Sequence, residues 1–113
     1  MKICELLEIY NFHDSLVEEI VHAEEKIQIR IDFCNWKQDG YKDGDEETKE
    51  MSLIFENVYH TDIPAIKPNS DEIIDVKEVK NNESETGIEL LLFNDIKGTT
   101  YSVVIFAKSV SIS

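Results

Sequence analysis

The segment from Lys26 to Cys34 constrains the fold more than any other part of this sequence. Every second residue in it is large and apolar, and the residues between are mostly polar; the apolar set is Ile27, Ile29, Ile31 and Phe33. Successive side chains of a strand point to opposite faces, so this spacing gathers the apolar groups on one side. All of them are β-branched or aromatic, as strands favour. We therefore expect a strand over 26–34 with one buried face.

The segment before this strand permits two interpretations. Apolar residues of 16–23 lie at helical spacing, and Ser15 with Glu18 could form a capping box. Alternatively, 16–23 is a strand, and Glu24 and Glu25 form a tight turn into the next strand. A helix here would have barely two turns, which is marginal. A hairpin supplies an antiparallel neighbour at once. We favour the hairpin.

The rest of the chain alternates between apolar runs and polar turns. We expect a short helix over 2–10, an exposed mobile loop over 37–50, a polar turn over 81–85 and a turn around Gly98. Further strands are expected over 51–60, 72–80, 87–94 and 100–113.

Two of these expected strands carry specific predictions about which side chains face inward. In the first, Met51, Leu53, Phe55 and Tyr59 share one face. In the second, Ile74 and Val76 point inward, and the out-of-phase Val79 indicates a bulge or bend.

The pattern as a whole predicts the fold class. The chain has 113 residues, the size of a single domain, here 1–113. Strands that follow one another with short turns, and little helix, indicate a mainly β protein. We expect an antiparallel sandwich or half-barrel of five or six strands with one short N-terminal helix.

Charge narrows the classes of partner. Asp and Glu number 24 against 11 Lys and Arg, which gives a formal net charge of −13. Such a surface repels phosphate backbones and anionic lipids, so we expect neither nucleic-acid nor membrane binding. It attracts a basic protein partner, although the acids could also serve only solubility. We find no apolar run long enough for a membrane span and no secretory signal, so a cytoplasmic location is expected.

The sequence offers no assembled catalytic or cofactor site. No two of the histidines and cysteines lie close enough to form a zinc-ligand pair, and we expect no metal or cofactor. Cys4 and Cys34 are expected to be free thiols. An enzyme built on His13, Asp14 and His60 would need these side chains to converge. We expect instead a non-enzyme in which Asp14 and Ser15 cap backbone donors.

The acidic segment after the strand over 26–34 is the candidate partner-binding site. Aromatic side chains adjoin a run of carboxylates, and such anchors carry much of the energy of protein contacts. The predicted partner-binding residues are Trp36, Tyr41, Asp43, Asp45, Glu46 and Glu47. Separately, the end of the last strand, 109–113, has alternating Ser and apolar residues and no charge. We expect this edge to be covered or used in a homodimer.

Several short motifs carry a resemblance. The sequence FHDS at 12–15, Ile20, Ile31-Asp32, Trp36 and Leu53-x-Phe55-x-Asn57-Val58 resemble a pattern in small bacterial domains of unknown function. Some relatives of those domains are described as immunity proteins of polymorphic toxin systems. The resemblance covers residues 12–59, and it implies a small, acidic, non-catalytic protein that binds a toxin domain to block it.

Two functions of different classes follow. The first is a cytoplasmic binding protein, of the immunity type, that inhibits a basic toxin domain through the acidic segment. The alternative is a small-molecule or carbohydrate-binding module that uses the inside of a curved sheet. The alternative requires an open pocket lined by apolar residues with a few polar groups.

Overall fold

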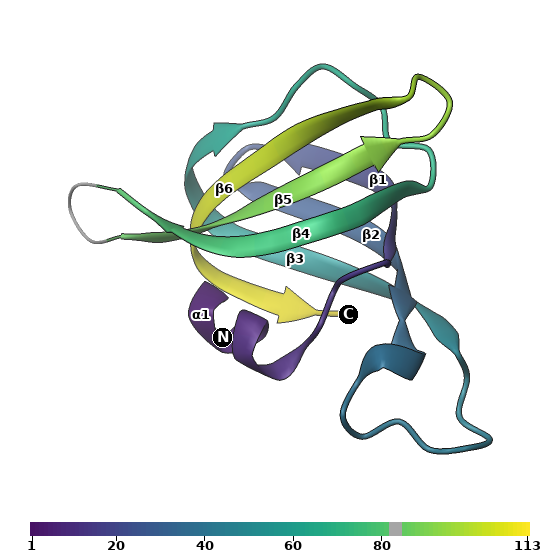
Figure 1. Cartoon of the computed structure of the whole chain (residues 1–113). Helices are drawn as coiled ribbons and strands as arrows, with labels where there is room; N and C mark the ends of the chain where they lie inside the picture. Colours follow the sequence, from purple (N-terminus) through teal and green to yellow (C-terminus); the bar gives the residue numbers. More distant parts are fainter. Residues whose placement is uncertain (82–84) are drawn as a thin grey trace.

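The computed structural model describes residues 1–81 and 85–113. The elements follow the chain as the helix α1, the strands β1 and β2, a short 3₁₀ helix η1, and the strands β3 to β6 (Figure 1). Their bounds are Ile3–Ile9 for α1, Leu16–Ala23 for β1, Lys26–Cys34 for β2, Asn35–Lys37 for η1, Thr48–Asp62 for β3, Asp71–Lys80 for β4, Thr86–Asn94 for β5 and Thr99–Ile112 for β6.

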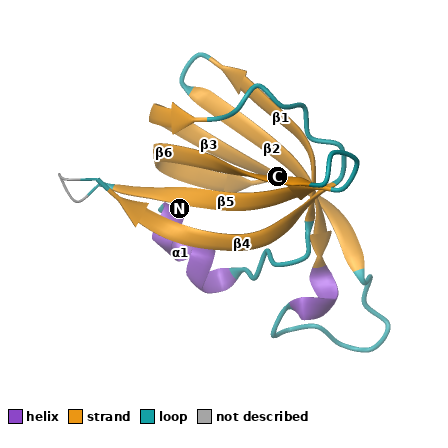
Figure 2. Ribbon diagram, turned by 45° about the horizontal axis from the view of Figure 1, so that its top comes forward, coloured by secondary structure: helices purple, strands orange, loops and turns teal. Residues whose placement is uncertain are grey.

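The six strands form one antiparallel sheet that closes on itself in the order β1-β2-β3-β6-β5-β4 (Figure 2). The predicted class, mainly β and antiparallel with one short N-terminal helix, is therefore confirmed. Of the predicted arrangements, the half-barrel is the nearer one, and the sheet goes further because β1 meets β4. Helix α1 lies beside the barrel, and its Ile3 and Leu6 are buried against the core.

The hairpin predicted from the sequence is present. Strand β2 has the predicted bounds, and all four of its alternating apolar side chains are at most 1% exposed. Strand β1 pairs with it from Leu16 to Ala23, and the turn falls at Glu24 and Glu25. The helical alternative for 16–23 is wrong. Ser15 forms no capping box, because its Oγ accepts a hydrogen bond from the backbone N–H of Cys34 at 2.9 Å.

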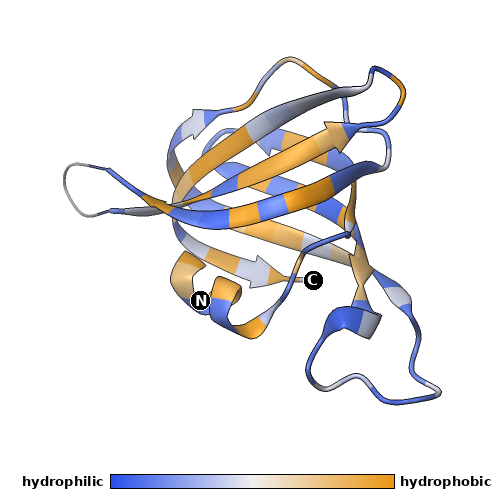
Figure 3. Cartoon of the chain, in the orientation of Figure 1, coloured by the Kyte–Doolittle hydropathy of each residue, from blue (hydrophilic) through white to orange (hydrophobic). Residues whose placement is uncertain are grey.

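Apolar side chains of all six strands fill the inside of the barrel. Figure 3 shows apolar and polar residues alternating along the strands, as expected where one face is buried. Phe33, Phe55, Leu90, Leu92 and Ile105 are among the largest fully buried side chains. The interior is thus a packed core rather than an open cup.

Two predictions about inward-facing residues are wrong because the ladders contain irregularities. The pairing of β3 with β6 shifts between Val58 and His60, next to Asn57 at φ +54°, so Tyr59 leaves the buried face and is 43% exposed. In β4 the shift lies between Ile73 and Asp75. The bulge that the out-of-phase Val79 indicated is therefore present, but it lies earlier in the strand. An extra residue in a strand reverses the alternation between inward-facing and outward-facing side chains.

The shift in β4 decides which isoleucine faces the core. Ile73 is 1% exposed, whereas the predicted Ile74 is only half-buried. Val76 does pack against the core, as predicted. The predicted turn at 81–85 includes residues 82–84, which lie outside the described residues.

The barrel closes through a short contact between β1 and β4. Only Leu16 and Val17 pair with β4, opposite Glu72 and Asp71. Two backbone hydrogen bonds extend the contact: Asp14 N–H donates to the Ile73 carbonyl at 3.0 Å, and Ile73 N–H donates to the Ser15 carbonyl at 2.8 Å.

A buried polar cluster lies at this closure. The Asp71 side chain, which is fully buried, accepts hydrogen bonds from Asn94 Nδ2 at 3.0 Å and from the Tyr101 hydroxyl. Asp71 therefore links the first residue of β4 to β5 and β6. Its acceptors are paired, which makes the burial of this carboxylate tolerable.

The end of the last strand is covered, one of the two outcomes that we expected for 109–113. On one side Ser109 to Ile112 pair with β3, and Ser113 exchanges backbone hydrogen bonds with Ser52 at 3.0 Å. On the other side the Met1 carbonyl accepts a hydrogen bond from Val110 N–H at 2.8 Å, and the N-terminal amine donates to the Val110 carbonyl at 2.9 Å. This coverage removes the reason for expecting a homodimer through this edge.

Replacing Asp71 is expected to destabilise the barrel. Asp71→Ala leaves Asn94 and Tyr101 without their buried acceptor, so the free energy of unfolding should fall by about 2–4 kcal/mol. Urea denaturation measures this change. As a control, Asp95→Ala in an exposed turn should alter it by less than about 0.5 kcal/mol. Equal effects of the two substitutions would contradict the role of the cluster.

Tyr101 makes stability depend on pH in alkali. Burial, and then the hydrogen bond and charge of Asp71, raise the pKa of Tyr101 above its ordinary value of 10.0. Below that value both the folded and unfolded states keep the proton; above it the unfolded state loses the proton first, so stability falls as pH rises. Urea denaturation between about pH 9 and pH 11.5 should show a shallower decline for Tyr101→Phe than for the wild type. Parallel declines would contradict this.

Candidate functional site

The predicted partner-binding residues lie in and beside a loop that projects from the barrel between β2 and β3 (Figure 1). We call residues 38–47 the acidic loop. It is shorter than the predicted loop over 37–50, because η1 contains Lys37 and β3 begins at Thr48, which pairs with Cys34.

Hydrogen bonds join the end of the acidic loop to η1, the helix that precedes the loop. Trp36 N–H donates to the Glu47 carbonyl at 3.0 Å, and Asn35 Nδ2 donates to the Glu46 carbonyl at 2.8 Å. Both bonds use backbone carbonyls of the acidic residues. The side chains of Glu46 and Glu47 therefore remain exposed to solvent.

The acidic loop is also tied to the connection that follows α1. Gln38 Nε2 donates to the Asn11 carbonyl at 2.7 Å and to the Cys34 carbonyl at 3.0 Å. In return, Gln38 Oε1 accepts a hydrogen bond from Asn11 N–H at 2.9 Å. The sequence predicted a mobile loop, and the structure shows one whose base is held at both ends.

Two of the predicted site residues hold the loop together from within. Asp45 Oδ2 accepts a hydrogen bond from Lys42 N–H at 3.0 Å, and Asp45 N–H donates to the Lys42 carbonyl at 3.0 Å. The Tyr41 hydroxyl donates to the Asp45 carbonyl at 3.3 Å. Asp43, at the exposed turn between them, makes the loop more acidic without sharing these bonds.

Trp36 stands at the base of the loop with half of its surface exposed (50%). The Lys37 ammonium lies 5.2 Å from the centre of the indole ring and 2.5 Å from Asp14 Oδ2. This ammonium therefore links the indole to Asp14, two residues before β1. The cation beside the ring is a favourable contact.

Asp14 is held in an unusual conformation at this contact. Its φ is +68°, in the left-handed region that Asp tolerates better than most residues. Hydrogen bonding to Lys37 lowers the pKa of Asp14, and the same bond raises the pKa of Lys37. We predicted that Asp14 and Ser15 both cap backbone donors. Ser15 does so, whereas the Asp14 carboxylate pairs with Lys37 and, at 3.1 Å, with His13 Nδ1.

A hollow of about 280 Å³ separates the acidic loop from the end of α1. Tyr10 and Phe33 give it an apolar lining, together with Tyr41 and Asp45 of the acidic loop and Lys49 of β3. Ile9 at its rim is 60% exposed. Aromatic and acidic side chains thus converge from three parts of the chain.

The histidines and Cys34, which could have served in a catalytic or metal site, lie apart in the described part of the chain. Within residues 1–81 and 85–113, no three His, Cys, Asp or Glu side chains form a group that could hold a metal ion. Burial raises the pKa of Cys34, which disfavours its reactive thiolate. His13 contacts Asp14, but His60 packs its ring on Phe106 at 5.7 Å, and no contact in the described part of the chain joins His60 to that pair.

Comparisons with known proteins do not add a family. Neither protein-family models nor curated proteins nor solved structures match this chain. The resemblance over residues 12–59 therefore stays a prediction. Among the described residues we also find no helix with the length and apolar character needed to cross a membrane.

Sequence reasoning missed the residues that position the loop. Asn11 and Gln38 are 27 positions apart, and Asp14 and Lys37 are 23 apart, so neither contact leaves a local pattern. Of these four residues, only Asp14 was singled out from the sequence, as part of FHDS. The exposed residues could be found from a local run of acidic and aromatic residues, but the residues that hold the loop in place could not.

The ion pair between Asp14 and Lys37 should be visible in a titration. Because Lys37 lowers the Asp14 pKa, the pair contributes stability above the ordinary Asp pKa of 3.8, and this contribution is lost as pH falls through the lowered value. In Lys37→Met, the Asp14 pKa measured by carboxyl NMR should rise toward its ordinary value. Lys42→Met, which removes an exposed lysine of the loop, should leave it unchanged. An unchanged Asp14 pKa in Lys37→Met would contradict the pairing.

Proposed function

We propose that this chain is a non-catalytic, cytoplasmic protein-binding domain that inhibits a basic partner, in the manner of an immunity protein that blocks a toxin domain. One observation carries the proposal. The acidic loop is anchored at its base by hydrogen bonds, while Trp36 and the carboxylates of Asp43, Glu46 and Glu47 face solvent.

Such a loop is suited to binding a protein surface. A loop already held in one conformation loses less entropy when it binds. The half-exposed indole of Trp36 supplies an aromatic anchor, with Tyr41 and the hollow beside it as a second apolar contact. The carboxylates steer a basic partner and hold it in register. Inhibition then follows from covering the partner's own site.

The net charge of −13 supports the choice of partner. Nucleic acids and anionic membranes would be repelled by the same carboxylates, so neither belongs to the proposal. A basic protein is attracted, and the attraction weakens as salt screens it.

The alternative function has less support. A small-molecule or carbohydrate module would need a pocket inside the curved sheet. The inward side chains of the described strands instead pack on one another, with Ile29, Leu53 and Leu92 almost fully buried. This packing favours a function on the outer surface.

Neutralising the acidic loop should weaken binding to the partner. The test uses the protein product of the neighbouring gene and the triple variant Asp43→Asn, Glu46→Gln, Glu47→Gln. We expect the association rate at low salt, measured by biolayer interferometry, to fall at least about tenfold, because electrostatic steering is lost. The wild-type affinity should also fall steeply as salt is raised.

A matched variant controls for net charge. Glu24→Gln, Glu25→Gln and Asp95→Asn remove three negative charges in the β1–β2 and β5–β6 turns, away from the acidic loop. This variant should bind almost as well as the wild type. Equal losses in both triple variants, or an affinity that ignores salt, would rule out a contact through the acidic loop.

A further inference from the structure

Strand β4 has an open edge beside the barrel closure. It pairs with β5 from Glu72 to Lys80, but only Asp71 and Glu72 pair with β1 on the other side. Beyond Ile73, which bonds to Asp14 and Ser15, no further strand pairs with this side of β4 in the part of the chain that the structure describes. Figure 2 shows this edge facing α1.

The register defines which backbone groups lie on the open edge. Ile73 N–H and carbonyl both face the β1 side. Ile73 is opposite Leu92, Asp75 is opposite Leu91, and Val76 is opposite Leu90, so the extra residue places Val76 in phase with Ile73. The same alternation places the N–H and carbonyl of Glu78 on this edge.

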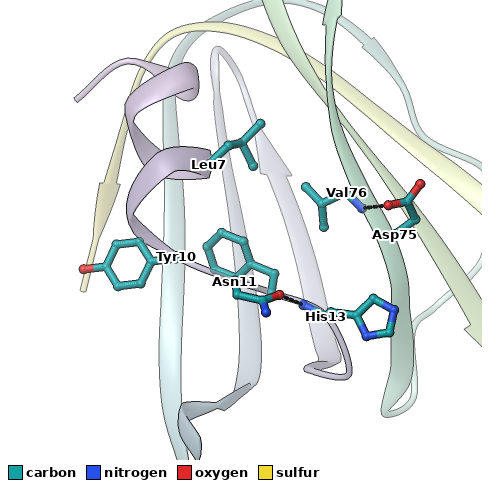
Figure 4. A pocket seen from close by; sticks show the side chains of 7 residues that line it. Leu7, Tyr10, Asn11, His13, Asp75 and Val76 are labelled. Carbon is teal, nitrogen blue, oxygen red and sulfur yellow. Dashed lines mark hydrogen bonds between the residues drawn. The ribbon is translucent and has the colours of Figure 1, made fainter. Parts of the chain in front are cut away.

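The structure shows how the first of these donors is occupied. Val76 N–H donates to Oδ1 of the neighbouring Asp75 at 3.0 Å (Figure 4). A local carboxylate therefore fills the place of a strand partner. An aspartate that covers its own strand edge can also release it, because the bond is exposed to water.

A hollow of about 280 Å³ lies against this edge (Figure 4). Leu7, Tyr10, Phe12 and Val76 give it an apolar lining, and His13 and Asp75 stand at its side. A hollow of this size accepts an aliphatic side chain from a strand laid beside β4. Strand spacing of about 4.8 Å brings such a strand over it.

The charges along the edge favour a basic occupant. Lys77 pairs with Glu89 at 3.1 Å, and Lys80 pairs with Glu78 at 3.7 Å. Among the described residues Asp75 has no such cation. Its carboxylate is the uncompensated charge at the hollow, in a chain of net charge −13.

We propose that β4 binds an extended segment of the basic partner, which adds to the sheet as an antiparallel strand. Its inward-facing apolar residues exchange backbone hydrogen bonds with Val76 and Glu78, and one apolar side chain enters the hollow. Asp75 then leaves Val76 N–H and pairs with a lysine or arginine of the segment. The inference deepens the proposed function and rests on it for the basic character of the partner.

The two surfaces are continuous. Tyr10 lines both the hollow at β4 and the hollow beside the acidic loop. One partner can therefore place a strand on β4 and its basic surface on the acidic loop at the same time. The loop supplies attraction, and the strand edge supplies register.

The test uses the full chain and a hexapeptide of alternating lysine and valine, with an acetylated N-terminus and an amidated C-terminus. In antiparallel addition the valines face inward, so their N–H groups point at β4. Peptide binding should protect the amides of Val76 and Glu78 from hydrogen exchange measured by NMR. The same peptide with N-methylated valines should not bind, nor should one with glutamate in place of lysine.

Two variants at one position separate the backbone from the side chain. Glu78→Pro removes a donor that faces the open edge, so the pairing with β5 should survive; Glu78→Ala keeps the donor. We expect peptide affinity at least about tenfold lower in Glu78→Pro than in Glu78→Ala. If urea denaturation shows that Glu78→Pro does not fold, the wild-type protein decides whether the peptide pairs with β4. Val76 and Glu78 should then be protected by the peptide with ordinary valines and not by the peptide with N-methylated valines.

Several outcomes would overturn the inference. They are equal peptide affinities of the two Glu78 variants, no peptide binding at about 1 mM, or NMR chemical-shift changes on peptide addition that are confined to residues 35–47. Protection of Val76 that rises with protein concentration alone would assign the edge to a second copy instead. If the peptide experiments fail but the triple variant of the acidic loop still loses binding to the neighbouring gene product, the proposed function stands without the added strand. If the peptide experiments succeed but the triple variant binds as well as the wild type, β4 binds the strand and the acidic loop takes no part.

Discussion

Closure of the barrel depends on a short contact between the first and fourth strands. Two residue pairs and two further backbone hydrogen bonds join them, and the buried Asp71 side chain links that point to Asn94 and Tyr101. Few bonds thus convert an open sheet into a barrel that encloses its apolar faces. Since the burial of those faces supplies most of the stability of a small domain, the closure is worth more than its own hydrogen bonds.

The same closure explains where the two proposed interaction surfaces lie. Strand β4 leaves β1 after Ile73. Beyond that point no described strand pairs with this edge, the Asp75 carboxylate accepts the Val76 N–H, and a hollow lies between the edge and α1. At the same end of the β1–β2 hairpin, Lys37 of η1 and Gln38 hold the acidic loop against residues 11–14. Both proposed surfaces adjoin the connection from α1 to β1, so one segment of the chain positions the two contacts that we propose for a partner.

Local patterns predicted the elements well and their irregularities poorly. The alternation in β2 fixed its bounds and its buried face, because pleat and burial are properties of neighbouring residues. Tyr59 and Ile74 were misplaced because each is the extra residue of an irregularity in its ladder, and the pairing partner determines where such a residue falls. The exposed acids and Trp36 could be found from a local run of acidic and aromatic residues. Gln38 and Lys37 could not, because they bind residues more than 20 positions away.

The sequence by itself determined a mainly β antiparallel fold, its N-terminal helix and its acidic net charge. It favoured the first hairpin, and the pairing of Leu16–Ala23 with β2 excluded the helical alternative. Periodicity and net charge are sums over residues, and they are independent of how distant segments meet. Only the tertiary structure decided that the sheet closes, which edge of β4 stays open, and that the acidic loop is anchored at its base. Those features depend on hydrogen bonds between residues far apart in the chain, and such bonds form only when the strands are in register.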